Sequence, residues 1–135
     1  MTVVDASAVV DLLAPGRGAR RDFVLAQLPE PALPWLAPDV LPFEVFSVIR
    51  RYVLRRTLSG AGGGRALRRL RALPIELIPT SSLLGSAWSL RDRFSAADSL
   101  YAALALRVGE PLLTGDARLA RAAATSDIET RPVEG

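Results

Sequence analysis

Short apolar runs typical of β-strands alternate along this chain with longer segments of helical periodicity. The expected strands lie at residues 2–4, 35–37, 75–79, 111–114 and 128–133. Between them, apolar residues recur every three or four positions, which predicts helices. The expected helices lie at residues 7–13, 20–28, 40–56, 65–73, 82–90, 95–108 and 117–124. Because parallel strands need long crossovers, the alternation indicates an α/β fold with a mainly parallel sheet.

The length and the apolar content of the chain predict a single folded domain. The chain has 135 residues, of which 50% are hydrophobic, so residues 1–135 can bury one sizeable core. The N-terminus lacks the basic segment of a signal peptide, and the longest uncharged run, residues 77–90, is interrupted by Pro79 and Gly85. We therefore expect a soluble cytoplasmic protein.

Cysteine, histidine and lysine are all absent, and all 17 basic residues are arginine. Without histidine, the chain has no Ser-His-Asp triad, no imidazole base and no H-E-x-x-H zinc site. Without lysine, it has no Walker A phosphate loop and no Schiff-base chemistry. The net charge of +3 permits an anionic partner, and guanidinium groups are well suited to phosphates.

Polar residues mark the expected starts of several helices. Asp39 is predicted to cap the helix that follows it, Ser81 or Ser82 the helix ending near residue 90, and Ser95 the next one. Arg50 and Arg51 lie in the C-terminal turns of the helix after Asp39, where they oppose the helix dipole. The glycine-rich stretch at residues 59–64 is predicted to be a flexible connector to a second basic helix.

Two aspartates directly follow expected strands. Asp5 ends the run Val-Val-Asp, and Asp116 follows Leu-Leu-Thr-Gly. In open parallel sheets, functional sites form outside the carboxyl ends of strands, so both positions favour a site. Each residue has a simpler alternative role, Asp5 in the turn after its strand and Asp116 as a helix cap.

Two further acids lie on the inner faces of expected helices. Glu44 falls on an apolar stripe, where an unpaired carboxylate is costly, so it must be protonated, paired or bound to a cation. The alternative is a salt bridge to Arg91 or Arg93. Asp98 lies on the inner face of its helix, but it also fits the third helical position of a capping box that begins at Ser95.

The prediction of a functional site rests on the four acids taken together. Carboxylates that converge repel one another, and the chain has no lysine or histidine to neutralise them. Mg²⁺ or Mn²⁺, which take oxygen ligands, would relieve that repulsion. Most of the remaining acids are expected to be solvated on polar faces, in loops or in the tail. These are Asp11, Asp22, Glu30, Asp92, Glu110, Asp127, Glu129 and Glu134.

Four segments together resemble the PIN-domain family, and specifically its VapC-type toxin ribonucleases. They are V-V-D-A-S-A-V-V-D-L-L, A-P-D-V-L-P-F-E-V-F-S-V-I-R-R, F-S-A-A-D-S-L-Y-A-A-L-A and P-L-L-T-G-D-A-R-L-A-R-A, in this order. The resemblance implies a three-layer α/β/α sandwich around a parallel sheet. It also implies a homodimer that is inhibited by a small VapB-type antitoxin.

Carried over motif by motif, the resemblance assigns the acidic metal site to Asp5, Glu44, Asp98 and Asp116. Ser7 and Thr114 fall where family members support the metal or its waters.

The expected activity is metal-dependent hydrolysis of RNA phosphodiester bonds, with Mg²⁺ or Mn²⁺ activating a water molecule. Arg50 and Arg51 are candidate contacts to the RNA backbone, although solvated helix faces explain them equally well. Two alternatives remain open. One is a PIN nuclease with a housekeeping role in RNA or DNA processing, and the other is a PIN domain that binds RNA or protein without cleaving it.

Overall fold

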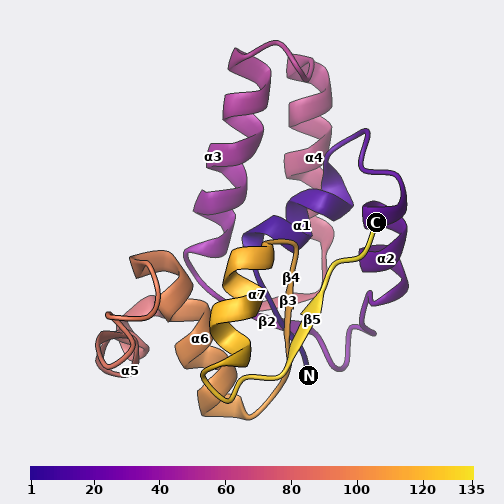
Figure 1. Cartoon of the computed structure of the whole chain (residues 1–135). Helices are drawn as coiled ribbons and strands as arrows, with labels where there is room; N and C mark the ends of the chain where they lie inside the picture. Colours follow the sequence, from indigo (N-terminus) through magenta and orange to yellow (C-terminus); the bar gives the residue numbers. More distant parts are fainter.

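A computed structural model describes residues 1–135 as a five-stranded parallel sheet with surrounding helices (Figure 1). The strands are β1 (Val3–Val4), β2 (Trp35–Pro38), β3 (Ile75–Ile78), β4 (Leu112–Thr114) and β5 (Thr130–Pro132). The helices are α1 (Ala6–Leu13), α2 (Ala19–Ala26), α3 (Leu41–Leu54), α4 (Gly60–Ala72), α5 (Leu84–Trp88), α6 (Ala96–Val108) and α7 (Ala117–Ala124). The predicted alternation of strands and helices is confirmed.

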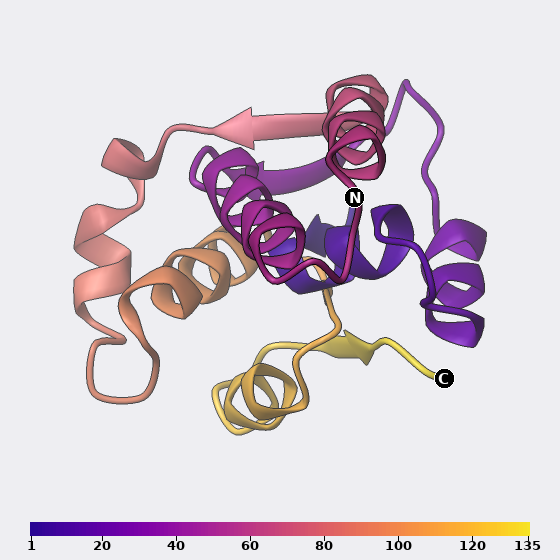
Figure 2. The same cartoon turned by 90° about the horizontal axis from the view of Figure 1, so that it is seen from above.

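The strand order is β3-β2-β1-β4-β5, and every neighbouring pair is parallel. Seen from above, β3 and β5 form opposite edges of the sheet (Figure 2). Helix α6 packs against β1, β2 and β4, whereas α1 and α7 both pack against β4. The architecture is the expected three-layer α/β/α sandwich.

The central strand β1 is short but fully buried, and it sets the position of the first acid. Val4 pairs with Leu113 of β4, and the next amide, that of Asp5, donates to the carbonyl of Leu113 at 3.2 Å. The carboxyl ends of β1 and β4 therefore lie side by side. None of the helices combines the length and the apolar character that a membrane-spanning helix requires.

The ends of α6 agree with the sequence. The Ser95 hydroxyl accepts a hydrogen bond from the Asp98 amide, and Gly109 ends the helix in the left-handed conformation with φ 66°. A side chain would be strained at that φ, which explains the glycine.

Two other predicted helix starts are wrong. Asp39 does not cap α3, because its carboxylate accepts instead from the amide of Thr80 at 2.9 Å and from the hydroxyl of that residue. That contact ties the start of α3 to the turn after β3. Neither Ser81 nor Ser82 caps a helix, because both lie in a short 3₁₀ turn, Thr80–Ser82, that precedes the short helix α5.

The glycine-rich stretch is helical, so the predicted connector at residues 59–64 is wrong. The Ser59 hydroxyl caps α4 by accepting from the Gly62 amide at 2.9 Å. A Cβ at Gly63 would lie 2.9 Å from a methyl group of Val53 and 3.3 Å from one of Ile49. Glycine therefore allows α4 to approach α3 closely, and the two helices form a hairpin that projects beyond the sheet (Figure 1).

Candidate active site

The four acids that the sequence singled out line one pocket of about 360 Å³. Asp5 follows β1, Glu44 lies in the first turn of α3, Asp98 in the first turn of α6, and Asp116 follows β4. Ser7, Ser47, Arg51 and Tyr101 also line this pocket, together with Ala6, Phe43 and Val48. The topology explains this convergence. The carboxyl ends of neighbouring parallel strands lie at one edge of the sheet, and the helices that carry the other acids begin at the same edge.

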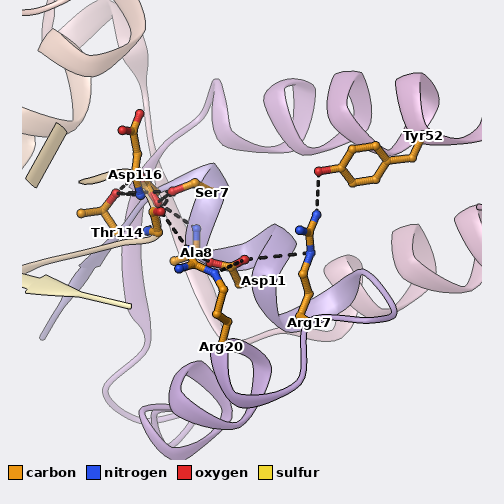
Figure 3. Close-up of polar contacts among 10 residues, drawn as sticks. Ser7, Ala8, Asp11, Arg17, Arg20, Tyr52, Thr114 and Asp116 are labelled. Carbon is orange, nitrogen blue, oxygen red and sulfur yellow. Dashed lines mark hydrogen bonds and ion pairs between the residues drawn. The ribbon is translucent and has the colours of Figure 1, made fainter. Parts of the chain in front are cut away.

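Asp5 is the most buried of the four acids, with 4% of its surface exposed. It caps α1, and its carboxylate accepts from the Ser7 hydroxyl at 2.7 Å, the Ala8 amide at 3.0 Å and the Thr114 hydroxyl at 2.6 Å. Burial raises the pKa of Asp5 to about 6, although these three hydrogen bonds act to lower it. Ser7 and Thr114 therefore both orient Asp5, and Figure 3 shows them next to Asp116.

Glu44 is paired with a tyrosine rather than with an arginine. Its Oε1 accepts from the Tyr101 hydroxyl at 2.6 Å. The proposed salt bridges to Arg91 or Arg93 are absent, because Arg91 lies over a tryptophan ring and Arg93 donates to Ser126. Burial raises the pKa of Glu44, while the hydrogen bond from Tyr101 lowers it. Burial and the nearby Glu44 charge raise the pKa of Tyr101, so its hydroxyl stays protonated and remains a donor.

Asp98 and Asp116 share one arginine. The guanidinium of Arg118 lies 3.3 Å from Asp98 Oδ2 and 3.7 Å from Asp116 Oδ2. Because the Arg118 side chain is 67% exposed, these contacts are weak and readily exchanged. Burial raises the pKa of Asp98, the Ser95 hydrogen bond and Arg118 lower it, and repulsion from Asp116 adds to the rise.

The capping role considered for Asp116 is present, and the one considered for Asp98 is present in part. Asp116 caps α7, because its Oδ1 accepts from the amides of Arg118 at 2.9 Å and Leu119 at 3.2 Å. Asp98 receives only the serine half of a capping box, and its carboxylate faces Arg118 instead of the Ser95 amide. Asp98 thus keeps its carboxylate directed toward the pocket.

The donor set suits a hard divalent cation. It consists only of oxygens, and one of the carboxylates, Asp5, is buried with a raised pKa beside the like charge of Asp116. As the side chains stand, no three acids are close enough to hold one ion together. The exposed Arg118 is the cation present between two of them, and moving it aside costs little.

The two arginines considered for RNA differ in position. Arg51 lines the acidic pocket from α3, and Arg50 does not. Both side chains are exposed, and neither forms an ion pair. Arg51 is therefore positioned to contact a ligand in the pocket, and Arg50 is not.

Several residues near the site are not apparent from the sequence. The expectation that Asp11 is solvated is wrong, because only 4% of it is exposed and it pairs with Arg20. The spacing of Tyr101 from Asp98 places both on one helix face, but the hydrogen bond to Glu44 is a tertiary contact. Nothing in the local sequence distinguishes Arg118 from the other arginines.

The chain is similar to known proteins over most of its length. The family model described as PIN domain matches residues 2–125. Ribonuclease VapC3 of Mycobacterium tuberculosis is 44% identical over 120 residues, covering 89% of this chain and 85% of the relative. Ribonuclease VapC1 of the same organism is 42% identical, with 89% of each chain covered. VapC ribonuclease Mb0985 of Mycobacterium bovis is 35% identical, with 88% of each covered.

Proposed function

Because this chain belongs to the PIN-domain family, we propose that it is a divalent-metal-dependent endoribonuclease, the toxin of a toxin–antitoxin pair. The observation that carries the proposal is the convergence of Asp5, Glu44, Asp98 and Asp116 on one pocket in a chain without histidine, cysteine or lysine. One sheet includes strands from both ends of the chain, which supports treating residues 1–135 as a single nuclease domain.

The carboxylates would hold the cation, with Mg²⁺ as the first choice and Mn²⁺ as the alternative. When bound, a divalent cation supplies an activated water molecule and polarises the scissile phosphate. Asp5 is held rigidly by its three donors and presents a fixed ligand. Tyr101 donates to Oε1 of Glu44 and leaves Oε2 without a hydrogen bond, free to bind the cation or to accept a proton.

Arg51 would hold the RNA backbone beside the acids. It lies on the same face of α3 as Glu44, it lines the pocket, and its guanidinium is unpaired. A phosphate contact of this kind contributes affinity without base specificity and depends on salt. Its neighbour Arg50 provides a matched control, because it has the same charge and lies on the same helix but outside the pocket.

A protein partner is also part of the proposed function. From the likeness to VapC ribonucleases we propose a VapB-type antitoxin as the partner, and a second copy of this chain as a further one. Phe43 and Trp88 support such contacts, because they are 67% and 68% exposed, respectively. Exposed apolar side chains mark protein-binding surfaces where they form a patch, and Trp88 lines an apolar groove together with Leu84, Ala87 and Phe94.

The activity is tested by cleavage of labelled RNA and single-stranded DNA in Mg²⁺, Mn²⁺ or EDTA. Asp98→Asn removes one acid of the pocket, and Asp92→Asn is the control, because Asp92 is exposed and does not line the pocket. We expect RNA cleavage by wild type and Asp92→Asn, and none by Asp98→Asn or in EDTA. Equal cleavage by all three proteins, or activity that survives EDTA, would refute the metal-carboxylate mechanism.

The role of Arg51 is tested by RNA binding without cleavage. In an Asp98→Asn background, the affinity for RNA is measured against salt concentration by fluorescence anisotropy. Arg51→Ala should reduce the slope of log affinity against log salt by about one, whereas Arg50→Ala should leave it unchanged. Identical slopes for the two variants would show that Arg51 is not a phosphate contact.

A further inference from the structure

A buried aspartate and a partly exposed arginine form an ion pair beside the acidic pocket. Asp11 of α1 accepts two hydrogen bonds from Arg20 of α2, from Nε to Oδ1 at 3.1 Å and from Nη2 to Oδ2 at 2.7 Å (Figure 3). The Asp11 side chain is 6% exposed and that of Arg20 31%. This two-point geometry fixes the guanidinium plane, so the pair is a rigid unit rather than a mobile surface contact.

The same arginine holds the loop that carries Asp116. Arg20 Nη2 donates to the carbonyl of Gly115 at 2.9 Å, and the Gly115 amide donates to the Ser7 hydroxyl at 2.9 Å. Both peptide groups that flank Gly115 are therefore held. Only this residue separates the end of β4 from Asp116.

Gly115 is packed against the ion pair as well as bonded to it. A Cβ at this position would lie 2.3 Å from Asp11 Oδ2 and 2.9 Å from Arg20 Nη2. No other residue type fits without displacing the pair. The close approach allows the guanidinium to reach the Gly115 carbonyl while it stays bonded to Asp11.

A second arginine also faces Asp11 but does not reach the loop. Arg17 Nε lies 4.0 Å from Asp11 Oδ1, and the Arg17 guanidinium donates to the Tyr52 hydroxyl at 2.6 Å (Figure 3). It therefore supplies charge to Asp11 and links it to α3. The contact to Gly115 belongs to Arg20 alone.

We propose that Asp11 and Arg20 are positioning residues for the metal site: they fix Gly115 and thereby hold the Asp116 carboxylate at the pocket. The inference rests on the proposed function, in which Asp116 binds a cation. Residues behind the ligands of a metal commonly set its affinity, because small displacements of a ligand weaken binding. Neither residue lines the acidic pocket.

The most informative substitution is Arg20→Lys. Lysine keeps the charge beside Asp11 but, as a single ammonium group, cannot reproduce the two-point contact together with the bond to Gly115. Arg21→Lys is the matched control, because Arg21 lies on the same helix and faces only the exposed Asp22 at 3.8 Å. Val24→Ala controls for lost stability, since Val24 is fully buried on α2 and its side chain cannot form a hydrogen bond to the loop.

Two measurements on the full chain test the proposal. One is Mn²⁺ affinity by isothermal titration calorimetry, and the other is amide hydrogen exchange at Gly115 in metal-free protein. We expect Arg20→Lys to weaken Mn²⁺ binding on the order of tenfold and to accelerate exchange at Gly115. Arg21→Lys and Val24→Ala should keep the wild-type affinity, even where Val24→Ala lowers the melting temperature.

The outcomes separate this inference from the proposed function. Wild-type affinity and wild-type exchange in Arg20→Lys would overturn the positioning role. An equal loss of affinity in Val24→Ala would also overturn it, because the effect would then reflect general instability. If wild type itself binds no Mn²⁺, the proposed function fails, and the exchange data alone then decide whether the ion pair fixes the loop.

Discussion

Replacing the buried Asp5 by asparagine should stabilise the metal-free protein at neutral pH while it abolishes cation binding. The pKa of Asp5 is about 6 in the fold, against 3.8 for a solvated aspartate. Each tenfold change in a protonation equilibrium corresponds to about 1.4 kcal/mol, so ionising Asp5 in the folded state costs about 3 kcal/mol. At pH values above the folded pKa, Asp5 is ionised in the folded protein and this cost applies in full.

The pH dependence follows from the sign of this difference. Because the folded pKa is the higher one, the contribution of Asp5 to stability is fully present below about pH 4 and is lost as the pH rises through about 6. Asparagine carries no charge and escapes this loss. Its amide oxygen accepts fewer hydrogen bonds than the carboxylate, which costs about 1 kcal/mol of the gain.

The expected net gain for Asp5→Asn is therefore about 2 kcal/mol at about pH 8, and no gain is expected at about pH 4.5. Urea unfolding in EDTA, followed by tryptophan fluorescence, measures both values, because Trp35 is 1% exposed in the fold and becomes exposed on unfolding. Asp92→Asn serves as the control for losing an exposed carboxylate. A variant less stable than wild type at the higher pH, or an equal difference at both pH values, would refute the reasoning.

Four further substitutions test other parts of the structure. Gly63→Ala should lower the stability by about 1–3 kcal/mol, because its Cβ would meet α3, whereas Gly64→Ala should raise it by up to about 1 kcal/mol. Thermal melts measure both, and equal effects would show that close helix packing is not the reason for Gly63. Arg118→Ala should increase Mn²⁺ affinity up to about fivefold in calorimetry, because a competing cation is removed; unchanged affinity would contradict this competition. Tyr101→Phe removes the hydrogen bond that lowers the pKa of Glu44, so the acid limb of the cleavage rate should move to higher pH; an unmoved limb would exclude Glu44 as its source.

The strand and helix pattern was predictable because each element has its own local periodicity. The acids of the pocket were predictable for two separate physical reasons. Asp5 and Asp116 follow strands, and the ends of parallel strands meet at one edge of a sheet. Glu44 lies on a helical stripe that is otherwise buried, where a carboxylate needs a partner or a cation.

The glycine-rich start of α4 could not be predicted in the same way. Glycine disfavours helices in general, so local propensity indicates a connector. The helix forms because Ser59 caps it and because Gly63 packs against Ile49 and Val53 of the preceding helix. Packing between helices overrode local propensity here.

The environment of Asp11 depends on contacts that are distant in sequence. Arg20 follows nine residues later, and the Gly115 carbonyl that shares its guanidinium is 95 residues beyond Arg20. A lone aspartate in an apolar helix gives no indication of such partners. Similarly, Asp39 has the sequence of a helix cap, but its carboxylate bonds to Thr80, 41 residues away.

Two arginines near the acids, Arg20 and Arg118, have different roles. Arg20 is bound at two points to a buried aspartate, and because an unpaired buried charge is costly, it cannot leave Asp11. Arg118 bridges two carboxylates from an exposed position, so a divalent cation can replace it at little cost. Arg20 therefore fixes the backbone of the site. Arg118 balances the charge of the carboxylates only while no divalent cation is bound. Since every basic residue is an arginine with the same fixed charge, burial and geometry alone distinguish these two roles.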